Sequence, residues 1–189
     1  MSLYQKAGLI QSDISPQNLL VNENDDNPAW WSFLIDLDLA IRVECDSFSR
    51  AQDKTGTRAF MAIDVLYGEM HSFMHNLESF FWFLFWVCIH YNGPGKGRIV
   101  QQFEEWNYMH TEKLANEKKG VISDEEDFLR IVKNNFTLFY QPLIHCVNWL
   151  HRLVFPDGGH WKKLNSNLPQ NMIEELEHAQ KDPGVADNQ

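Results

Sequence analysis

The chain has 189 residues, a length that suits one domain with a substantial buried core. Hydrophobic residues make up 44% of it and aromatic residues 13%, which excludes wholesale disorder. The formal net charge of −10 argues against a protein that grips a nucleic-acid backbone with a basic face, although a single nucleotide needs only a few cations or a metal.

The cysteines and the apolar stretches indicate a soluble intracellular protein, cytoplasmic or nuclear, with no membrane or nucleic acid among its partners. Residues 1–8 lack the apolar core of a signal peptide. The longest apolar stretch, residues 77–89, is too short to span a bilayer. The three cysteines are widely spaced and form no CxxC pair, which is typical of a reducing compartment: Cys45, Cys88 and Cys146.

The first part of the chain predicts a small β-hairpin. Pro16 and its polar neighbours exclude a continuous helix at that point. Residues 19–21 are apolar and predict a short strand, and the β-prone residues 31–37 predict a second one. A polar, acidic turn region separates them at 22–27, so a hairpin with a long loop is expected, followed by a loop over 41–58.

The rest of the chain predicts helices. Residues 75–91 are apolar on nearly every face, as in a buried central helix, and a Gly-rich turn at 93–97 ends it. Ser123 or Asp124 is the expected N-cap of a later helix. The expected helices are 62–67, 75–91, 99–118, 124–139, 142–153 and, within a polar tail that starts near 158, 170–181.

Three polar residues carry the most specific chemistry. Asp13 and Asn18 have the spacing D-x-x-x-x-N, and Asp36 lies at the end of the second predicted strand. Phosphoryl transfer requires neutralising metal ions and an aligned hydroxyl, so three oxygen-bearing groups must converge near the end of such a hairpin. Carboxylate and amide oxygens are suitable ligands for Mg²⁺. The spacing alone also fits a polar turn, in which Asp and Asn are common.

Four blocks of sequence resemble the fungal-type protein kinase family, in the order in which kinases carry them. The blocks are similar to its catalytic loop, its metal-binding motif with D-x-D in place of DFG, the end of its activation segment and the start of its central helix: residues 8–18, 34–40, 56–66 and 75–82. Beyond residue 91 the resemblance rests on the order of helices.

The resemblance implies a mainly α fold: a protein kinase-like C-terminal lobe with a small β-hairpin at the catalytic loop. No Gly-rich loop, strand lysine or helix glutamate precedes the catalytic loop, so the N-terminal lobe is expected to be absent. The expected lobe covers 1–157 and precedes a polar tail at 158–189; within it lie the catalytic loop at 8–21, the metal motif and activation segment at 34–64, the central helix at 75–91 and further helices over 99–155.

The resemblance also implies the cofactors and the catalytic residues. Asp13 would be the catalytic base, while Asn18 and Asp36 would hold the Mg²⁺ that accompanies ATP. Thr57 matches the family residue that hydrogen-bonds the base.

The implied substrate platform contains Gly56, Thr57 and Asp64, the last in place of the family's Glu. Asn76 stands where the family has Asp, and it would brace the catalytic loop by accepting backbone N–H bonds without a charge.

Two functions therefore stay open at this level. The first is a serine/threonine kinase lobe that transfers phosphoryl from ATP–Mg²⁺ to a protein hydroxyl once an N-terminal lobe completes it. The alternative is an inactive, pseudokinase-like module that binds a partner protein, because the family's His-Arg before the base is Gln11-Ser12 here. A lone lobe would expose apolar surface near Leu9, Leu20 and Leu37, which predicts self-association through this inter-lobe face.

Other patterns have simpler explanations. His71 and His75 have i, i+4 spacing and could bind a metal with Glu104 or His110, but ordinary surface or core histidines are favoured. Residues 30–31 are both Trp, and burial in the core is favoured over a sticky patch.

Overall fold

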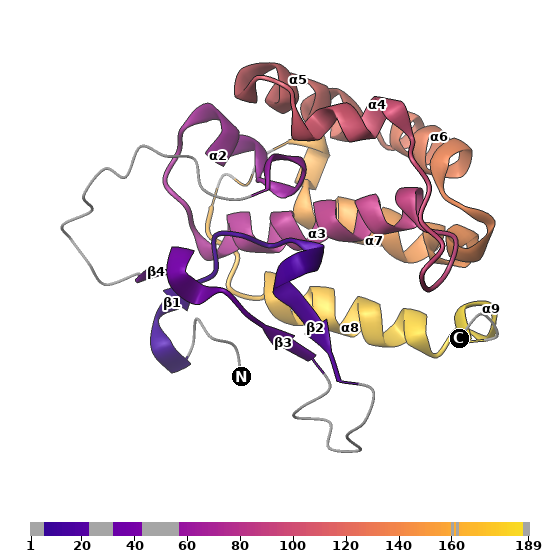
Figure 1. The fold of residues 1–189 in the computed structure, drawn as a ribbon, viewed down its shortest axis with the longest axis horizontal. Coiled ribbons are helices and arrows are strands. Elements are labelled where there is room, and N and C mark those ends of the chain that lie inside the picture. The colour runs from indigo at the N-terminus through magenta and orange to yellow at the C-terminus, as the bar shows by residue number, and fades with distance from the viewer. Residues whose placement is uncertain (1–5, 23–31, 43–56, 160, 162, 187–189) are drawn as a thin grey trace.

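The computed structural model describes residues 6–22, 32–42, 57–159, 161 and 163–186. Helices form most of the molecule and surround α3 (Phe73–His90), while short strands lie at one side, near the N-terminus (Figure 1). The mainly α, kinase-like fold that the sequence predicts is confirmed. No helix among the described residues is long and apolar enough to cross a membrane.

Two small antiparallel sheets are present in the N-terminal segment. β1 (Leu9–Ile10) pairs with β4 (Ile41–Arg42), and β2 (Leu19–Val21) pairs with β3 (Ser32–Leu34). The predicted hairpin is therefore confirmed. Its second strand ends three residues early because Asp36 adopts a left-handed backbone conformation, with φ 55° and ψ 61°, which starts the 3-10 turn η3 (Leu37–Leu39).

The central helix α3 is confirmed, and it begins at Phe73 because Ser72 forms a capping box. Ser72 Oγ accepts a hydrogen bond from the His75 N–H, and His75 Nδ1 accepts one from the Ser72 N–H. Phe81, Trp82 and Phe85 share one face of this helix and are at most 1% exposed, and every other residue of the helix is buried or half-buried. A helix with no exposed residue organises the core around itself.

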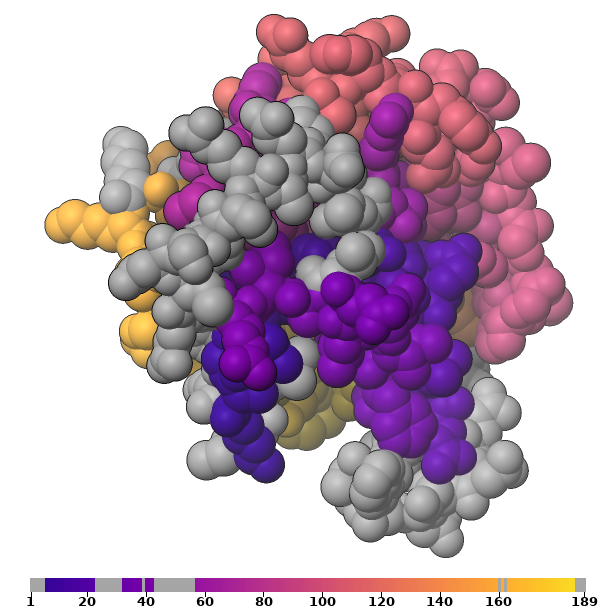
Figure 2. All heavy atoms as spheres, turned by 60° about the vertical axis from the view of Figure 1, so that its left-hand side comes forward, coloured from indigo at the N-terminus to yellow at the C-terminus, as the bar shows by residue number. Residues whose placement is uncertain are grey.

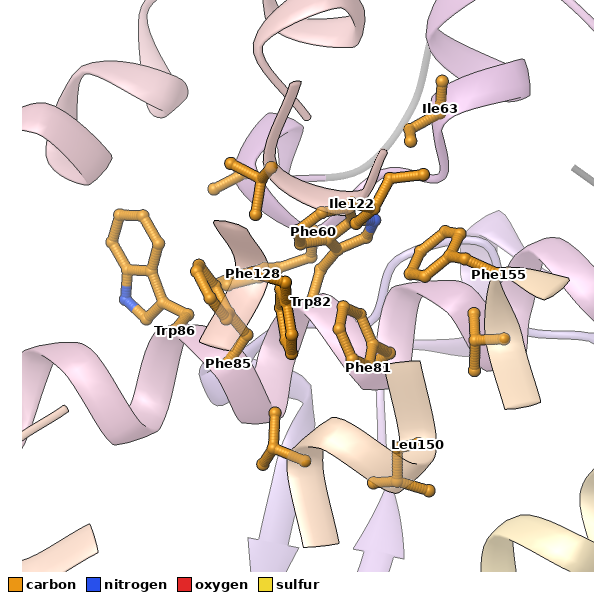
Figure 3. Close-up of a cluster of buried hydrophobic side chains, with 14 of the residues drawn as sticks. Phe60, Ile63, Phe81, Trp82, Phe85, Trp86, Ile122, Phe128, Leu150 and Phe155 are labelled. Carbon is orange, nitrogen blue, oxygen red and sulfur yellow. The ribbon is translucent and has the colours of Figure 1, made fainter. Parts of the chain in front are cut away.

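Aromatic rings fill the space around α3 (Figure 3). Phe81 meets Phe155 edge to face at 5.1 Å between ring centres, and Trp82 meets Trp106 in the same way at 5.5 Å. Edge-to-face contacts add to the free energy gained from burying the rings. The short elements η4 (Arg58–Phe60) and α2 (Ile63–Tyr67) pack on the same core, where Phe60 contacts the Trp86 ring at 5.6 Å.

The remaining helices complete the body. They are α4 (Gln101–Glu104), η5 (Glu105–Asn107), α5 (Thr111–Ile122), α6 (Glu125–Asn135), η6 (Leu138–Leu143), α7 (Ile144–Val154), η7 (Pro156–Gly158), α8 (Leu168–Gln180) and α9 (Pro183–Ala186); η1 (Pro16–Asn18) lies in the catalytic loop. The prediction of one helix over 99–118 was wrong, because His110 has an extended ψ of 141° and starts a new helix there.

Two further boundaries differ in detail. Asp124 is the N-cap of α6, as expected, with its Oδ1 accepting from the Asp127 N–H at 2.9 Å. That helix ends at Asn135, before Phe136, which is extended at ψ 139°. The helix expected at 170–181 within the polar tail is present as α8, which starts two residues earlier, packs on α7 and buries Leu168 and Met172 in the core.

Two thiols are buried in this body. Cys88 is 0% and Cys146 is 3% exposed, and both are free. Burial raises the pKa of the Cys146 thiol to about 12, and it raises the pKa of the Cys88 thiol as well. Cys45 and the Trp pair at 30–31 lie outside the described residues.

Candidate functional site

Asp13 is held by hydrogen bonds from two segments of the chain. Its Oδ1 accepts from the Thr57 N–H at 2.9 Å and from the Thr57 hydroxyl at 3.3 Å. Its Oδ2 accepts from Asn18 Nδ2 at 3.0 Å. The hydrogen bond expected between Thr57 and Asp13 is therefore present, and the position of the carboxylate is fixed from both sides.

Asn18 connects the catalytic loop to the hairpin. Its Nδ2 also donates to the Asp13 carbonyl at 3.1 Å, so both of these hydrogen bonds go to Asp13 and the amide oxygen Oδ1 remains for a ligand. Its backbone carbonyl accepts from the Ile35 N–H at 3.0 Å. This contact across the hairpin places Asn18 beside the residue that precedes Asp36.

Gln11 fixes the backbone of the metal motif. Its Nε2 donates to the carbonyl oxygens of Ile35 at 3.1 Å and Asp36 at 2.8 Å. The side chain is only 1% exposed. Sequence reasoning had noted Gln11 only as a substitution for the family's His. An amide with two N–H donors, two residues before the base, is the signal that could have revealed this role.

The oxygen atoms at the site suit a hard divalent cation. Asp36 is exposed, and no hydrogen bond to its carboxylate is recorded among the described residues. Together with Asn18 Oδ1, it supplies the carboxylate and amide oxygens that Mg²⁺ prefers. These two residues fit the ion that kinases use, and sulfur or imidazole ligands are not among them.

The comparison with protein families agrees with this geometry. The model for the fungal protein kinase family matches residues 1–88. Residues 1–88 are therefore similar to fungal protein kinases. No curated protein and no solved structure gives a match. The family segment runs from the N-terminus into α3 and includes Asp13, Asn18, Asp36 and Thr57.

The candidate site lies at the surface of the molecule, where Asp36 is exposed and Asp13 is half-buried. Figure 2 shows residues 6–22 (indigo) and 32–42 (purple) side by side at the surface, in front of the helical body. A hollow of about 620 Å³ is found elsewhere, over α5, and it is lined by residues such as His110 and Lys113. None of the three expected catalytic and metal residues lines it.

The residues expected to form a substrate platform are described in part. Gly56 lies outside the described residues. Thr57 precedes the η4 turn, and Asp64 lies half-buried in α2 with its Oδ2 3.9 Å from His75 Nε2.

A group of possible metal ligands lies around Asp64. One ligand atom each from Asp64, Glu69 and His75 lies within 4.8 Å of the others. However, His75 Nδ1 accepts the Ser72 N–H, so in a neutral ring the proton is on Nε2, the atom that faces Asp64. This arrangement favours a polar contact between His75 and Asp64 over a bound metal. Burial and, secondarily, His75 lower the pKa of the neighbouring His71 to about 4.

The brace expected at Asn76 is not formed. Its Oδ1 is buried and has no hydrogen-bond partner among the described residues. A neutral amide attracts N–H donors less strongly than the carboxylate of the family's Asp. In this chain the segment around Asp13 is held instead by the side chains of Gln11 and Asn18 and by the N–H and hydroxyl of Thr57.

Proposed function

We propose that this chain provides the catalytic lobe of a serine/threonine protein kinase, which transfers phosphoryl from ATP–Mg²⁺ to a protein hydroxyl. The observation that carries the proposal is the Asp13 carboxylate, which is oriented by Thr57 at 2.9 Å and Asn18 at 3.0 Å within a fungal kinase segment. A base that is held in this way is prepared to align a substrate hydroxyl.

Each residue has a role in the proposed reaction. Asp13 accepts the proton of the substrate hydroxyl as that oxygen forms its bond to the γ-phosphorus of ATP, while the bond from that phosphorus to the β–γ bridging oxygen breaks and ADP leaves. Asn18 Oδ1 and the Asp36 carboxylate hold Mg²⁺, which neutralises phosphate charge when it is bound. Thr57 keeps the base in place and begins the platform on which the substrate residue would lie. Gln11 keeps Asp36 at a constant position relative to the base.

We propose further that a second lobe covers ATP at this site. Asp36 and its neighbours Ile35 and Leu37 are exposed, the last two by 39% and 41%. Electrostatic stabilisation of a transferring phosphoryl group is strongest where water is excluded. A covering lobe would supply that exclusion and bury these apolar side chains at the same time.

A calorimetric titration with ATP, with and without Mg²⁺, tests the proposal. Binding that requires Mg²⁺ and is weakened at least about tenfold by Asp36→Ala is expected, since that carboxylate is a metal ligand. Glu126→Ala is the matched control: it removes one exposed negative charge from α6 and should leave the affinity unchanged. Binding that is indifferent to Mg²⁺, or weakened equally by both variants, would contradict the proposal.

A further inference from the structure

Two ionisable side chains are fully buried beside the end of the activation segment. Glu78 on α3 and Lys118 on α5 are each 0% exposed. Lys118 Nζ donates to the Met61 carbonyl at 2.6 Å, and Glu78 Oε1 accepts from the Ile63 N–H at 2.8 Å. The two side chains thus hold the backbone on either side of Ala62, which is itself 0% exposed.

The backbone at this point depends on these side chains for its hydrogen bonds. Met61 and Ala62 are extended, with ψ 140° and ψ 149°, and they separate η4 from α2. The Met61 carbonyl and the Ile63 N–H belong to no helix or strand ladder, so buried side chains must satisfy them. Burying an ionisable group has a high free-energy cost unless it makes specific contacts, and here both groups do so.

Trp82 joins the two side chains to the core. Its Nε1 donates to Glu78 Oε1 at 3.0 Å, and its ring centre lies 4.6 Å from Lys118 Nζ. Figure 3 shows Trp82 among the packed rings of Phe81 and Phe85 on α3. The attachment point of the activation segment is therefore a rigid part of the molecule.

A continuous chain of contacts leads from this attachment point to the catalytic base. Within η4, the Met61 N–H donates to the Arg58 carbonyl at 3.2 Å, and the Phe60 N–H donates to the Thr57 carbonyl at 2.9 Å. Thr57 then donates to Asp13 Oδ1 through both its N–H and its hydroxyl. Any displacement of Met61 would move the two groups that orient Asp13.

We propose that Glu78 and Lys118 are positioning residues, which anchor Met61 and Ile63 to the core and thereby hold Thr57 against Asp13. This inference rests on the proposed function only in taking Asp13 as the base. A purely stabilising role explains the pair less well, because a well-packed apolar pair is often equally or more stable than a buried charged one. The polar atoms matter because they reach specific backbone groups of the activation segment.

The test is amide hydrogen exchange in the full chain, followed at the Thr57 N–H by NMR. Lys118→Met and Glu78→Leu keep side-chain bulk but remove the polar contacts, so each should accelerate exchange at Thr57 by about tenfold. Glu78→Gln retains the Oε1 acceptor for Ile63 and Trp82 and should restore exchange to near the wild-type rate. Lys119→Met, which changes the adjacent lysine over the Tyr67 ring, should have no effect.

Amides of α6 and α7 separate positioning from general stability. The proposal expects them to keep their wild-type exchange rates while Thr57 changes. Acceleration of Thr57 and of these helices by the same factor, or no change at Thr57, would overturn it. If Glu78→Leu does not fold, Glu78→Asp decides the question with the same measurement, because it withdraws the acceptor by one methylene.

The outcome is also separable from that of the ATP titration. Thr57 exchange that responds to Glu78 and Lys118 supports positioning even where Mg²⁺-dependent ATP binding is absent, in which case only the proposed kinase function fails. Conversely, ATP binding that depends on Asp36, with Thr57 exchange unaffected by the variants, overturns the positioning role alone.

Discussion

Different forces stabilise the helical body, residues 57–186, and the N-terminal segment with the candidate site, residues 6–22 and 32–42. In the body, large side chains such as Trp82 and Phe85 are 0% exposed and pack ring against ring. In the segment, Leu20 and Val21 of the hairpin are 45% and 74% exposed. Side-chain hydrogen bonds from Gln11 to the Ile35 and Asp36 carbonyls, and from Asn18 to Asp13, hold the segment instead. Burial therefore stabilises the fold, while a few polar contacts define the site.

This difference teaches that stability and site geometry can be altered separately. Removing a large buried side chain costs about 3–5 kcal/mol, whereas a typical hydrogen bond contributes about 1 kcal/mol net. Regions with few buried apolar contacts also open locally at lower free energy than the core does. Substitutions in the two regions should accordingly give effects of different size and different extent along the chain.

The largest effect is expected from Trp82→Ala. It leaves a cavity among the rings around α3 and removes the indole N–H that donates a hydrogen bond to Glu78 Oε1. The free energy of unfolding should fall by about 3–5 kcal/mol in urea denaturation followed by circular dichroism. Trp149→Ala is the control, because that indole is 44% exposed, and it should cost less than about 1 kcal/mol. Equal losses would show that the core is not centred on α3.

A pH-dependent effect is expected from His71. Its pKa is lowered from 6.5 to about 4 by burial and then by His75, so the unfolded chain binds more protons between these two values. The contribution of neutral His71 to the free energy of unfolding is complete above pH 6.5 and is lost as the pH falls toward 4.

Relative to His71→Gln, the wild type should lose about 2 kcal/mol over that interval, less than the full shift implies because the ring is only partly buried. Urea denaturation at several pH values measures the difference. His178→Gln, an exposed change on α8, should leave the pH profile of the wild type intact. Parallel profiles for wild type and His71→Gln would refute the assignment.

A smaller and more local effect is expected from Gln11→Glu. The substitution keeps the shape of the side chain but replaces the Nε2 group, with its two N–H donors, by one carboxylate oxygen that faces the carbonyls of Ile35 and Asp36. Amides of residues 35–38 should exchange faster, consistent with a loss of about 1–3 kcal/mol confined to the segment. Exchange in α3 should stay as in the wild type. Spread of the effect into α3 would mean that the two regions are coupled more tightly than we infer.

The smallest effect on stability is expected from Leu20→Ser in the exposed hairpin. Leu20, Val21, Ile35 and Leu37 are exposed apolar residues of the catalytic segment, and we propose that they form a face for self-association. The variant should change the free energy of unfolding by at most about 0.5 kcal/mol. It should reduce the concentration-dependent association measured by analytical ultracentrifugation. A wild type that remains monomeric at high concentration would rule out this face as a contact between copies.

Much of the site was predictable because its residues are close in sequence or belong to recognisable blocks. The D-x-x-x-x-N spacing places Asn18 on Asp13, and the threonine of the activation-segment block does contact Asp13. The hairpin and the buried central helix follow from local patterns of apolar residues. These features depend on short-range chemistry, which one sequence can reveal.

The parts that were missed depend on contacts between distant residues. Lys118 reads as one more charged residue on a polar helix, and only the fold brings it to Met61, 57 positions away. The break before α5 was missed because residues 99–118 contain no Pro or Gly that would interrupt a helix. The buried oxygen of Asn76 was equally hidden, since its burial without a hydrogen-bond partner among the described residues depends on the fold and not on its neighbours in the sequence.

The rate at which the two buried thiols are labelled reports how often the helical body opens. Cys88 and Cys146 lie in the helical body, where burial disfavours the reactive thiolate, so a thiol reagent must wait until that body opens. In a Cys45→Ser background, the rate of thiol labelling would report the unfolding of the helical body. Amide exchange would report the local opening of the N-terminal segment. One sample could thus record whether the two regions come apart together or in succession.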